Sequence, residues 1–272
     1  MIRHAGSADD PALAPFRYRE RQLNTRLHRR GERDDARFVA EGDLVVGRAI
    51  AAGHVPDVIL CDPSLVDVLV STHGGVLEST DIVTAGEDVR RDATGLAVAL
   101  GVVGLFPKLR VSPLDDVIAT SPRILVLSQV DNPTNVGAIV RSAAAFGFTG
   151  LVLDSETSDP FARRALRVAM GTTFAMQITR VDDLRVALDA LHAAGHTSCS
   201  LTPAPDAVDL DDVSLPNDKV ALLLGSERDG LPGNVMATSS MKVRIPMHPG
   251  VDSLNVAAAA AVACYGLTRR NG

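Results

Sequence analysis

The sequence predicts an α/β protein in which helices cover both faces of a parallel sheet, with a smaller α/β domain in front of it. In the C-terminal half, near-continuous apolar runs such as residues 124–127 and 220–224 have the length of strands and alternate with helical stretches. Continuous apolar strands of this kind are typical of a parallel sheet that is buried on both faces. In the N-terminal half the same alternation occurs on a smaller scale, for example around residues 58–61.

The N-terminal half begins with residues 1–15, which are rich in Ala, Pro, Asp and Gly and show no periodicity, so we expect a disordered tail. A helix is predicted from Leu44 to Ile50, and Gly53 is its expected stop. We assign residues 16–107 to a small α/β domain. Its other expected elements are strands at 58–61, 82–84 and 95–100 and a helix at 65–70.

Three prolines in polar surroundings between residues 107 and 122 predict a linker, which we place at residues 108–121. Residues 122–272 then form the second domain, and Ser253 is the predicted N-cap of its last helix. Its expected elements are strands at 124–127, 151–153, 175–178, 197–201, 220–224 and 243–245, and helices at 136–146, 160–170, 181–194 and 253–267.

Composition excludes several classes of protein. The chain has 272 residues, of which 46% are hydrophobic and 22% charged, as in ordinary globular proteins. The three cysteines are far apart and show no CxxC spacing, so we expect neither a disulfide framework nor a zinc site but buried apolar residues. The seven histidines do not cluster with acids, so no metal is predicted. Without a signal peptide or a long apolar run, the chain is expected to be cytoplasmic and not membrane-bound.

The net charge of −6 taken alone argues against a nucleic-acid partner. However, eight arginines lie between residues 17 and 37, and phosphate binding depends on local rather than total charge. A solvated, arginine-rich helical face explains the same segment equally well. This segment by itself leaves the two interpretations open.

The first motif is the stretch Asp-Asn-Pro-Thr-Asn-Val-Gly-Ala-Ile-Val-Arg at residues 131–141, which follows a strand and opens a helix. Asn135 precedes Arg141 by six residues, less than two helical turns. A polar loop at the carboxyl end of a strand is where open α/β sheets bind ligands. On local features alone, a capped loop with a surface arginine is the simpler explanation.

Two further motifs follow strands near the end of the chain. In residues 223–232 two glycines flank Glu227, and glycine permits close approach of a backbone to a ligand, although an ordinary tight turn would look the same. In residues 245–257 a strand ends at a proline, a glycine-containing loop follows, and a helix begins near Ser253 and Asn255. The start of that helix offers free N–H groups to an acceptor.

The order and spacing of the three motifs resemble the SpoU/TrmH class of knotted (SPOUT) RNA methyltransferases. That class has an N-x-G-a-I-x-R segment, a G-x-E-x-x-G-L/P segment and an I-P-M…S-L-N-V-A segment that closes the chain. The match covers residues 122–270. Less specifically, residues 38–42 and 95–98 resemble the ends of the auxiliary domain of many such enzymes, a small α/β fold related to ribosomal proteins that is thought to help bind RNA.

The resemblance implies a C-terminal trefoil knot, a homodimer and S-adenosylmethionine (SAM) as cofactor. An apolar slot with few polar groups suits the methionyl and adenine parts of SAM, and the chain lacks the GxGxxG expected after the first strand of a Rossmann-type nucleotide site. By carry-over from the family, the cofactor residues are Leu224, Gly225, Ile245, Met247, Leu254, Asn255 and Val256.

The implied reaction moves a methyl group from SAM to a ribose 2′-hydroxyl of RNA, more readily ribosomal than transfer RNA. The implied catalytic residues are Arg141, Asn135, Glu227, Asn255 and Ser253. In this family the arginine that matches Arg141 is sometimes given the role of base, but a guanidinium stays protonated in proteins. We therefore expect Arg141 to hold the target phosphate and polarise the hydroxyl, while Glu227 orients Arg141 or accepts a proton.

For the RNA itself we predict contacts from arginines in both halves of the chain. These are Arg17, Arg19, Arg21, Arg26, Arg29, Arg30, Arg37, Arg163, Arg164 and Arg167. The alternative is a catalytically inactive RNA-binding protein that retains the fold. A nucleotide-dependent α/β enzyme is a third hypothesis, and no phosphate loop in the sequence supports it.

Overall fold

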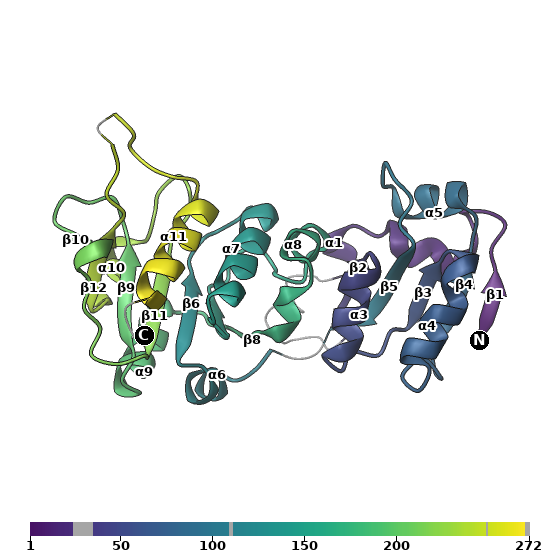
Figure 1. Cartoon of the computed structure of the whole chain (residues 1–272), viewed down its shortest axis with the longest axis horizontal. Helices are drawn as coiled ribbons and strands as arrows, with labels where there is room; N and C mark the ends of the chain where they lie inside the picture. The colour runs from purple at the N-terminus through teal and green to yellow at the C-terminus, as the bar shows by residue number, and fades with distance from the viewer. Residues whose placement is uncertain (24–34, 109–110, 249, 270–272) are drawn as a thin grey trace. The chain divides into compact units, whose positions relative to one another are not determined.

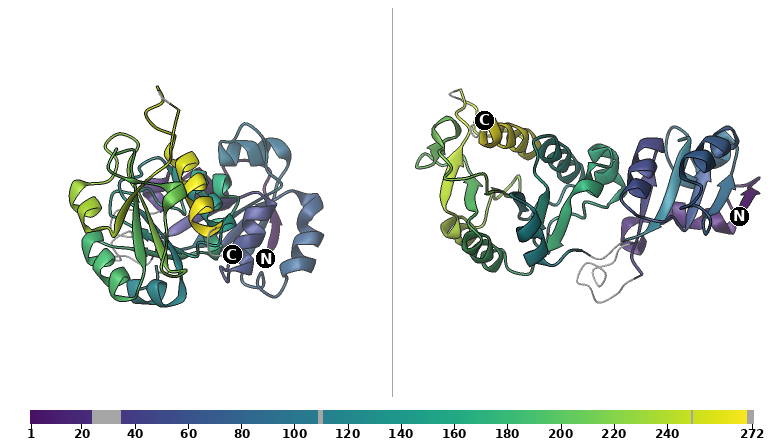
Figure 2. Two further views of the ribbon diagram at one scale, coloured as in Figure 1. Left: turned by 60° about the vertical axis from the view of Figure 1, so that its left-hand side comes forward. Right: turned by 60° about the horizontal axis from the view of Figure 1, so that its bottom comes forward.

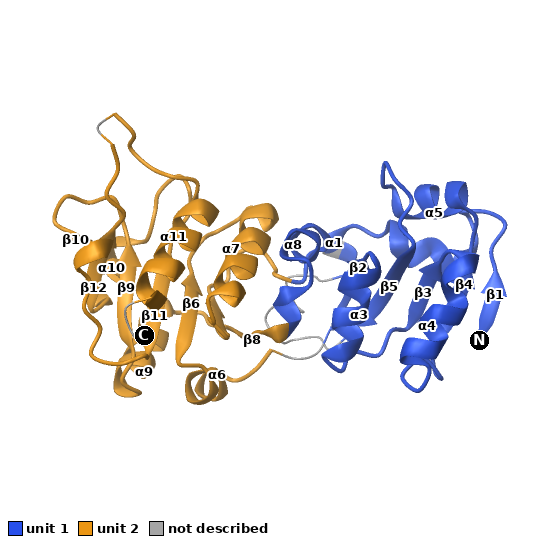
Figure 3. Ribbon diagram, in the orientation of Figure 1, with its two compact units in different colours: residues 1–110, 161–174 blue, residues 111–160, 175–272 orange. Residues whose placement is uncertain are grey.

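The computed structural model describes the chain except for residues 24–34, 109–110, 249 and 270–272. It forms two compact units (Figure 3). The first contains residues 1–110 together with residues 161–174, and the second contains residues 111–160 and 175–272. The predicted boundary therefore needs correction, because a helical segment of the predicted second domain packs within the first unit.

The first unit is built on a five-stranded sheet in the order β1-β4-β3-β5-β2, in which β5 is antiparallel to its two neighbours. Helices α3 and α4 supply the core on one face, and α5 with the 3₁₀ helix at Pro11–Arg17 supplies it on the other. The elements, labelled in Figure 1, are β1 (Ile2–His4), α1 (Glu20–Leu23), β2 (Arg37–Glu41), α3 (Asp43–Ala51), β3 (Val58–Cys61), α4 (Val66–His73), β4 (Asp81–Thr84), α5 (Glu87–Thr94) and β5 (Val102–Pro107).

The prediction of a disordered tail over residues 1–15 is wrong. Strand β1 pairs in parallel with β4, and Leu13 and Phe16 are completely buried in the core. Asp10 caps the 3₁₀ helix and accepts two hydrogen bonds from the Arg3 guanidinium at 2.7 and 2.8 Å, which holds the pKa of its carboxyl at about 2. The aspartate and proline content, which suggested disorder, serves here to begin a helix.

The strand predicted at residues 95–100 is also wrong. Gly95 adopts a left-handed conformation (φ +66°) and ends helix α5, its N–H donating to the Arg91 carbonyl at 2.9 Å. Val98 is 71% exposed, and of this run Leu100 packs against the core of the first unit without forming a strand. The strand of this region is β5, which begins seven residues after Gly95.

Residues 161–174 belong to the first unit because two of their aromatic rings join its core. Phe161 and Phe174 lie 5.4 and 5.6 Å from the ring of Phe38, which stacks on Phe106. Rings at these separations attract one another in addition to burying apolar surface. Between them, helix α8 (Arg163–Ala169) buries Leu166 in the same core.

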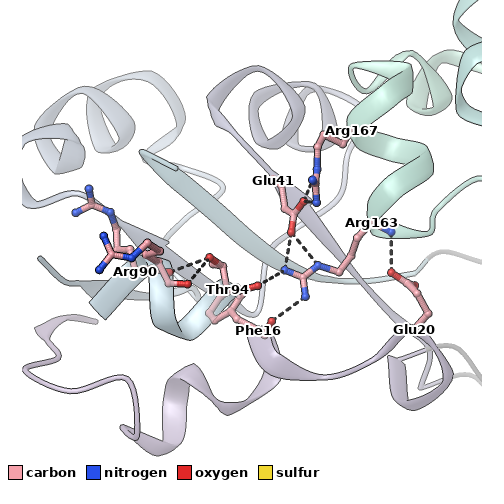
Figure 4. Close-up of polar contacts among 8 residues, drawn as sticks. Phe16, Glu20, Glu41, Arg90, Thr94, Arg163 and Arg167 are labelled. Carbon is pink, nitrogen blue, oxygen red and sulfur yellow. Dashed lines mark hydrogen bonds and ion pairs between the residues drawn. The ribbon is translucent and has the colours of Figure 1, made fainter. Parts of the chain in front are cut away.

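A buried carboxylate fixes helix α8 in place (Figure 4). The side chain of Glu41, at the end of β2, is 1% exposed and accepts hydrogen bonds from Arg163 at 2.5 and 2.9 Å and from Arg167 at 2.8 Å. Arg163 also donates to the carbonyl of Phe16 at 2.8 Å. A buried carboxylate of this kind is tolerated because two guanidinium groups satisfy it.

The second unit is a seven-stranded sheet in the order β10-β12-β9-β11-β6-β7-β8, and every pairing in it is parallel, as predicted. Its elements are α6 (Leu114–Thr120), β6 (Arg123–Leu127), α7 (Pro133–Ala145), β7 (Gly150–Leu153), β8 (Gln177–Arg180), α9 (Leu184–Ala193), β9 (Thr197–Leu201), β10 (Val208–Asp209), β11 (Val220–Leu224), α10 (Gly233–Thr238), β12 (Met241–Arg244) and α11 (Val256–Thr268).

Helices cover both faces of this sheet (Figure 2). Alternate residues of β6 and β11 pack against α6, α9 and α10 on one face. Helix α11 packs against α7 and β11, and both helices lie on the other side of the sheet. The expected linker at residues 108–121 is partly wrong, because it contains α6, whose Val117 is completely buried.

The three cysteines are buried, as predicted. Burial raises the pKa of Cys61 to about 11 and those of Cys199 and Cys264 to about 12, so their thiols stay protonated at neutral pH. Among the described residues, no helix has both the length and the apolar character needed to cross a membrane.

We predict that Glu41→Ala destabilises the protein by about 3–5 kcal/mol, because the mostly buried Arg163 guanidinium then loses its carboxylate partner. Arg91→Ala, which breaks the surface pair with Asp88, is the matched control and should cost at most about 1 kcal/mol. Urea unfolding of the two variants measures the difference. Equal losses of stability would show that the ion pairs of Glu41 with Arg163 and Arg167 contribute no more to the free energy of unfolding than a surface ion pair does.

Candidate functional site

The candidate site lies at the carboxyl edge of the second sheet, where β6 and β11 are neighbours. The N–H of Ser128, directly after β6, donates to the carbonyl of Leu224, the last residue of β11, at 2.9 Å. Ligands of open α/β sheets bind beyond the carboxyl ends of the strands. The loops that leave β6 and β11 therefore start side by side, although about a hundred residues separate them.

Three predicted catalytic residues meet at this edge through hydrogen bonds. The side-chain amide of Asn135 donates to the Glu227 carboxylate, and Asn255 donates to the side-chain oxygen of Asn135 at 3.3 Å. Asn135 is buried, whereas Glu227 and Asn255 are exposed. This junction, which we call the Asn–Glu–Asn junction, joins one residue from each of the three sequence motifs.

Local structure explains how each motif reaches the junction. Asn132 caps helix α7 by accepting from the N–H of Thr134 at 2.9 Å, so Asn135 lies in the first turn of that helix. Asn255 caps α11 by accepting from the N–H groups of Ala257 at 3.0 Å and Ala258 at 3.4 Å. The prediction that Ser253 is this cap is wrong: Ser253 is exposed, two residues before the true cap.

The loop that presents Glu227 folds back on itself. Ser226 and Gly230 exchange backbone hydrogen bonds at 3.2 and 3.1 Å, and Gly230 has a left-handed φ of +68°. A Cβ atom on Gly225 would lie 2.1 Å from the backbone of Gly230, so no larger residue fits there. The two predicted glycines thus close a tight loop that directs Glu227 toward Asn135.

Arg141 does not join the junction. Six residues of helix correspond to about 1.7 turns, so Arg141 points about 120° away from Asn135 around the axis of α7. Its side chain is exposed, and none of the described residues forms a hydrogen bond or ion pair with it. Glu227, expected to orient Arg141, instead accepts from Asn135.

The predicted cofactor residues lie at strand ends and at the start of α11. Leu224 and Gly225 are buried at the end of β11, and Ile245 and Met247 are half-buried just after β12. The remaining cofactor residues are Leu254, which is 40% exposed, Asn255 and the half-buried Val256. None of these seven predicted cofactor residues carries a charge.

The predicted RNA-binding arginines fall into different environments. Glu41 binds the guanidinium groups of both Arg163 and Arg167 (Figure 4); Arg163 is mostly buried, whereas the Arg167 side chain is 49% exposed. Arg164 between them is exposed and has no partner among the described residues. Arg17 pairs with Asp9 at 3.1 Å and Arg37 with Asp57 at 2.6 Å, both at the surface, and Arg19 is exposed. Arg26, Arg29 and Arg30 lie outside the described residues, as does the side chain of Arg21.

Among the residues with described positions, no group of three or more His, Cys, Asp and Glu side chains is arranged to hold a metal ion. Burial lowers the pKa of His54 and of His196 below the usual range, and each has one ring nitrogen with no hydrogen-bond partner. His54 packs edge-on against Phe38, and His196 donates from Nε2 to the carbonyl of Ser121 at 3.0 Å. Neutral buried imidazoles of this kind act as core residues.

Residues 122–265 match the model of the SpoU rRNA Methylase family, and the chain belongs to this family. An uncharacterized tRNA/rRNA methyltransferase of Mycobacterium tuberculosis is 32% identical over 265 residues, which cover 96% of this chain and 90% of that protein. The 23S rRNA (guanosine(2553)-2'-O)-methyltransferase RlmP of Bacillus subtilis is 29% identical over 153 residues, 56% of this chain and 60% of that protein. The predicted family is confirmed, and with it the class: an RNA methyltransferase.

Solved structures agree over almost the whole chain. The AdoMet-bound rRNA methyltransferase from Sinorhizobium meliloti superposes with a TM-score of 0.82 at 28% identity, covering 98% of each chain. The SpoU methyltransferase AviRb from Streptomyces viridochromogenes, in complex with AdoMet, shares the fold with a TM-score of 0.76 at 21% identity and covers 96% of this chain. The α/β architecture with a parallel sheet is thus that of SPOUT methyltransferases.

We predict that Asn135 and Glu227 are energetically coupled. In a double-mutant cycle of Asn135→Ala and Glu227→Ala, urea unfolding should give a coupling energy of about 1 kcal/mol, because the hydrogen bond has a charged acceptor that water partly screens. The matched cycle of Asn135→Ala with Arg228→Ala, the exposed neighbour of Glu227, should couple by less than about 0.5 kcal/mol. Equal coupling in both cycles would contradict the junction.

Proposed function

We propose that this chain transfers a methyl group from SAM to a ribose 2′-hydroxyl of RNA, and that the RNA is ribosomal rather than transfer RNA. The observation that supports it best is the Asn–Glu–Asn junction, which joins the three family motifs at the carboxyl edge of the sheet. The B. subtilis relative is named for 2′-O methylation of a guanosine in 23S rRNA. We therefore also propose that the protein acts in the cytoplasm, where ribosomal RNA is found.

SAM supplies an activated methyl group on its sulfonium. The residues present fit this cofactor, because Ile245, Met247 and Val256 are apolar and half-buried, and Gly225 has no room for a side chain. Neutral, mostly apolar side chains of this kind suit the methionyl and adenine parts. We propose that Leu224, Leu254 and Asn255 complete the binding site and that backbone groups of the loops provide most of its polar contacts.

The protein's own groups then orient the ribose and its phosphate. We propose that Arg141, exposed and without a protein partner among the described residues, holds the target phosphate and polarises the 2′-hydroxyl. Its guanidinium remains protonated, so the role of base does not suit it. Glu227 accepts the proton of the 2′-hydroxyl. Asn135 and Asn255 position the Glu227 carboxylate through their hydrogen bonds. Exposed Ser253 offers a further hydrogen bond to the substrate.

The first unit is proposed to help bind RNA, as the small ribosomal-protein-like domain of such enzymes. The described members of this surface are the exposed Arg17, Arg19 and Arg164 and the partly buried Arg37. In a chain with net charge −6, RNA contact has to be confined to such local patches. Arg21, Arg26, Arg29 and Arg30 stay predicted members of it.

We also propose that the C-terminal segment forms a trefoil knot and that the enzyme works as a homodimer. Helix α11 packs against α7, whose residues precede it by more than a hundred positions, so the C-terminal segment lies against the helix of the first motif. On α11, Val262 is 41% and Tyr265 is 43% exposed, which leaves apolar surface for a second copy. Sedimentation equilibrium of Tyr265→Asp should give the monomer mass, and a wild-type protein that is already monomeric would rule out the dimer.

The proposed activity predicts transfer of labelled methyl from SAM to RNA taken from a strain that lacks this gene. We expect label in ribosomal RNA and little in transfer RNA. Arg141→Ala should lower the rate by about a hundredfold or more, because a charge that stabilises the transition state is lost. Arg185→Ala, which removes an arginine paired with Asp183 outside the site, is the control and should leave the rate unchanged.

No label in either pool, from folded protein that binds SAM, would favour the alternative of an RNA-binding protein without activity. Label confined to transfer RNA would confirm the reaction and overturn the substrate.

The proposed RNA surface predicts that charge reversal weakens RNA binding and reduces its salt dependence. The triple variant Arg17→Glu, Arg19→Glu and Arg164→Glu should bind ribosomal RNA more weakly, with the slope of log K against log salt reduced by about 0.7–0.9 for each phosphate that the variant no longer binds. Arg185→Glu is the matched control on the second unit. An unchanged slope in the triple variant would exclude these arginines from the RNA surface.

A further inference from the structure

Asp154, directly after strand β7, has a carboxylate that joins two loops of the second unit. Its Oδ1 accepts from the hydroxyl and the N–H of Thr157 at 2.7 and 2.8 Å and from the N–H of Glu156 at 3.2 Å. Its Oδ2 accepts from the N–H of Gln129 at 2.8 Å and the hydroxyl of Ser128 at 3.0 Å. Five donors thus converge on one carboxylate, and two of them come from the loop between β6 and α7.

The same two loops are joined at three further points. The N–H of Val130 donates to the hydroxyl oxygen of Thr157 at 3.3 Å, and Val130 accepts from the N–H of Ser158 at 2.9 Å. The Ser158 hydroxyl donates to the carbonyl of Asp131. Every residue from 128 to 131 is therefore held by residues 154–158, immediately before Asn132 begins helix α7.

Gln129 shows that this arrangement is imposed on the loop. Its φ of +58° lies in the left-handed region, which costs a residue other than glycine about 1–2 kcal/mol. The side chain of Gln129 is exposed, and only its N–H contacts Asp154. Strained conformations of this kind persist where neighbouring groups determine them, and they concentrate at functional sites.

We propose that Asp154 is a positioning residue for methyl transfer. By holding residues 128–131 it sets where α7 begins, and hence where the first turn of α7 places Asn135 against Glu227. The proposal rests on the proposed function for its kinetic consequence. Its structural part, that the carboxylate orders the loop and the first turn of α7, can be measured without activity.

A carboxylate accepts at both oxygens, whereas an amide accepts at one and donates at the other. Asp154→Asn can keep the three hydrogen bonds at Oδ1, but it places an NH₂ group opposite the N–H of Gln129. The variant therefore removes the bond to the strained residue with little change in volume. Asp183→Asn is the matched control, because Asp183 caps α9 by accepting from the N–H of Arg185 at 2.9 Å.

The experiment compares kcat, the Kd for SAM and backbone hydrogen exchange in wild type, Asp154→Asn and Asp183→Asn. We expect Asp154→Asn to lower kcat at saturating SAM by about tenfold or more, because a misplaced group costs rate rather than cofactor affinity. The Kd for SAM should change by a smaller factor than kcat, because strand β11 and the cap of α11, which hold the neighbouring cofactor residues Leu224 and Asn255, stay in place. Exchange of the amides of Gln129 and the first turn of α7 should become faster, and Asp183→Asn should change neither kcat nor that exchange.

Rescue separates positioning from general destabilisation. Glycine adopts a positive φ without penalty, so Gln129→Gly added to Asp154→Asn should restore at least about a third of the wild-type kcat. Gln129→Gly alone should remain close to wild type, which excludes a role for the glutamine side chain. A kcat for Asp154→Asn within twofold of wild type, or a reduced kcat that glycine does not rescue, would overturn the proposal.

If wild type transfers no methyl group to any RNA, the proposed function fails but the positioning role is still tested. Faster exchange at Gln129 and in the first turn of α7, found in Asp154→Asn and absent from Asp183→Asn, would support it. Unchanged exchange in Asp154→Asn would overturn it.

Discussion

The parallel pairing of β6 with β11 is the constraint on which the site depends. It places the carboxyl ends of two distant strands together, and the bond from Ser128 to the Leu224 carbonyl continues the pairing into the loops. From that edge, short loops present Asn135 and Glu227 to each other, and α11 brings Asn255 to Asn135. Each of the three residues is held by an element with its own local cause: a capped helix start, a glycine-closed loop and a second capped helix start.

Asp154 extends this logic to a neighbouring strand. Because β7 pairs with β6, the residue after β7 lies beside the loop after β6, where a carboxylate can bind free backbone N–H groups. The first unit uses a buried carboxylate in another way. Glu41 binds Arg163 and Arg167 of helix α8. This helix lies in residues 161–174, which belong to the first unit although the chain before and after them belongs to the second. Two arginines predicted from the sequence to bind RNA, Arg163 and Arg167, thus also hold α8 against Glu41.

Much of the second unit could be predicted because β11 is apolar throughout and β6 is apolar after Arg123, and because Gly225 and Asn135 lie at strand and helix ends. The first unit was harder. Leu13 lies in, and Phe16 directly after, a segment without hydrophobic periodicity, and the apolar run at residues 95–100 exposes Val98 rather than forming a strand. The roles of Asp154 and Gln129 could not be predicted, since they depend on contacts between loops about 26 positions apart and on a positive φ with no glycine to mark it. For Asp154, the available signal in the sequence was its place as an acidic residue directly after the apolar strand β7.

The central claim is that the site at this edge methylates a ribose oxygen. Alkaline hydrolysis of RNA proceeds through the free 2′-hydroxyl, so a 2′-O-methylated linkage resists it. RNA labelled by the enzyme with radioactive methyl groups should therefore, after complete alkaline hydrolysis, release the label in dinucleotides. Label recovered in mononucleotides would mean that a base was methylated, which would contradict the account.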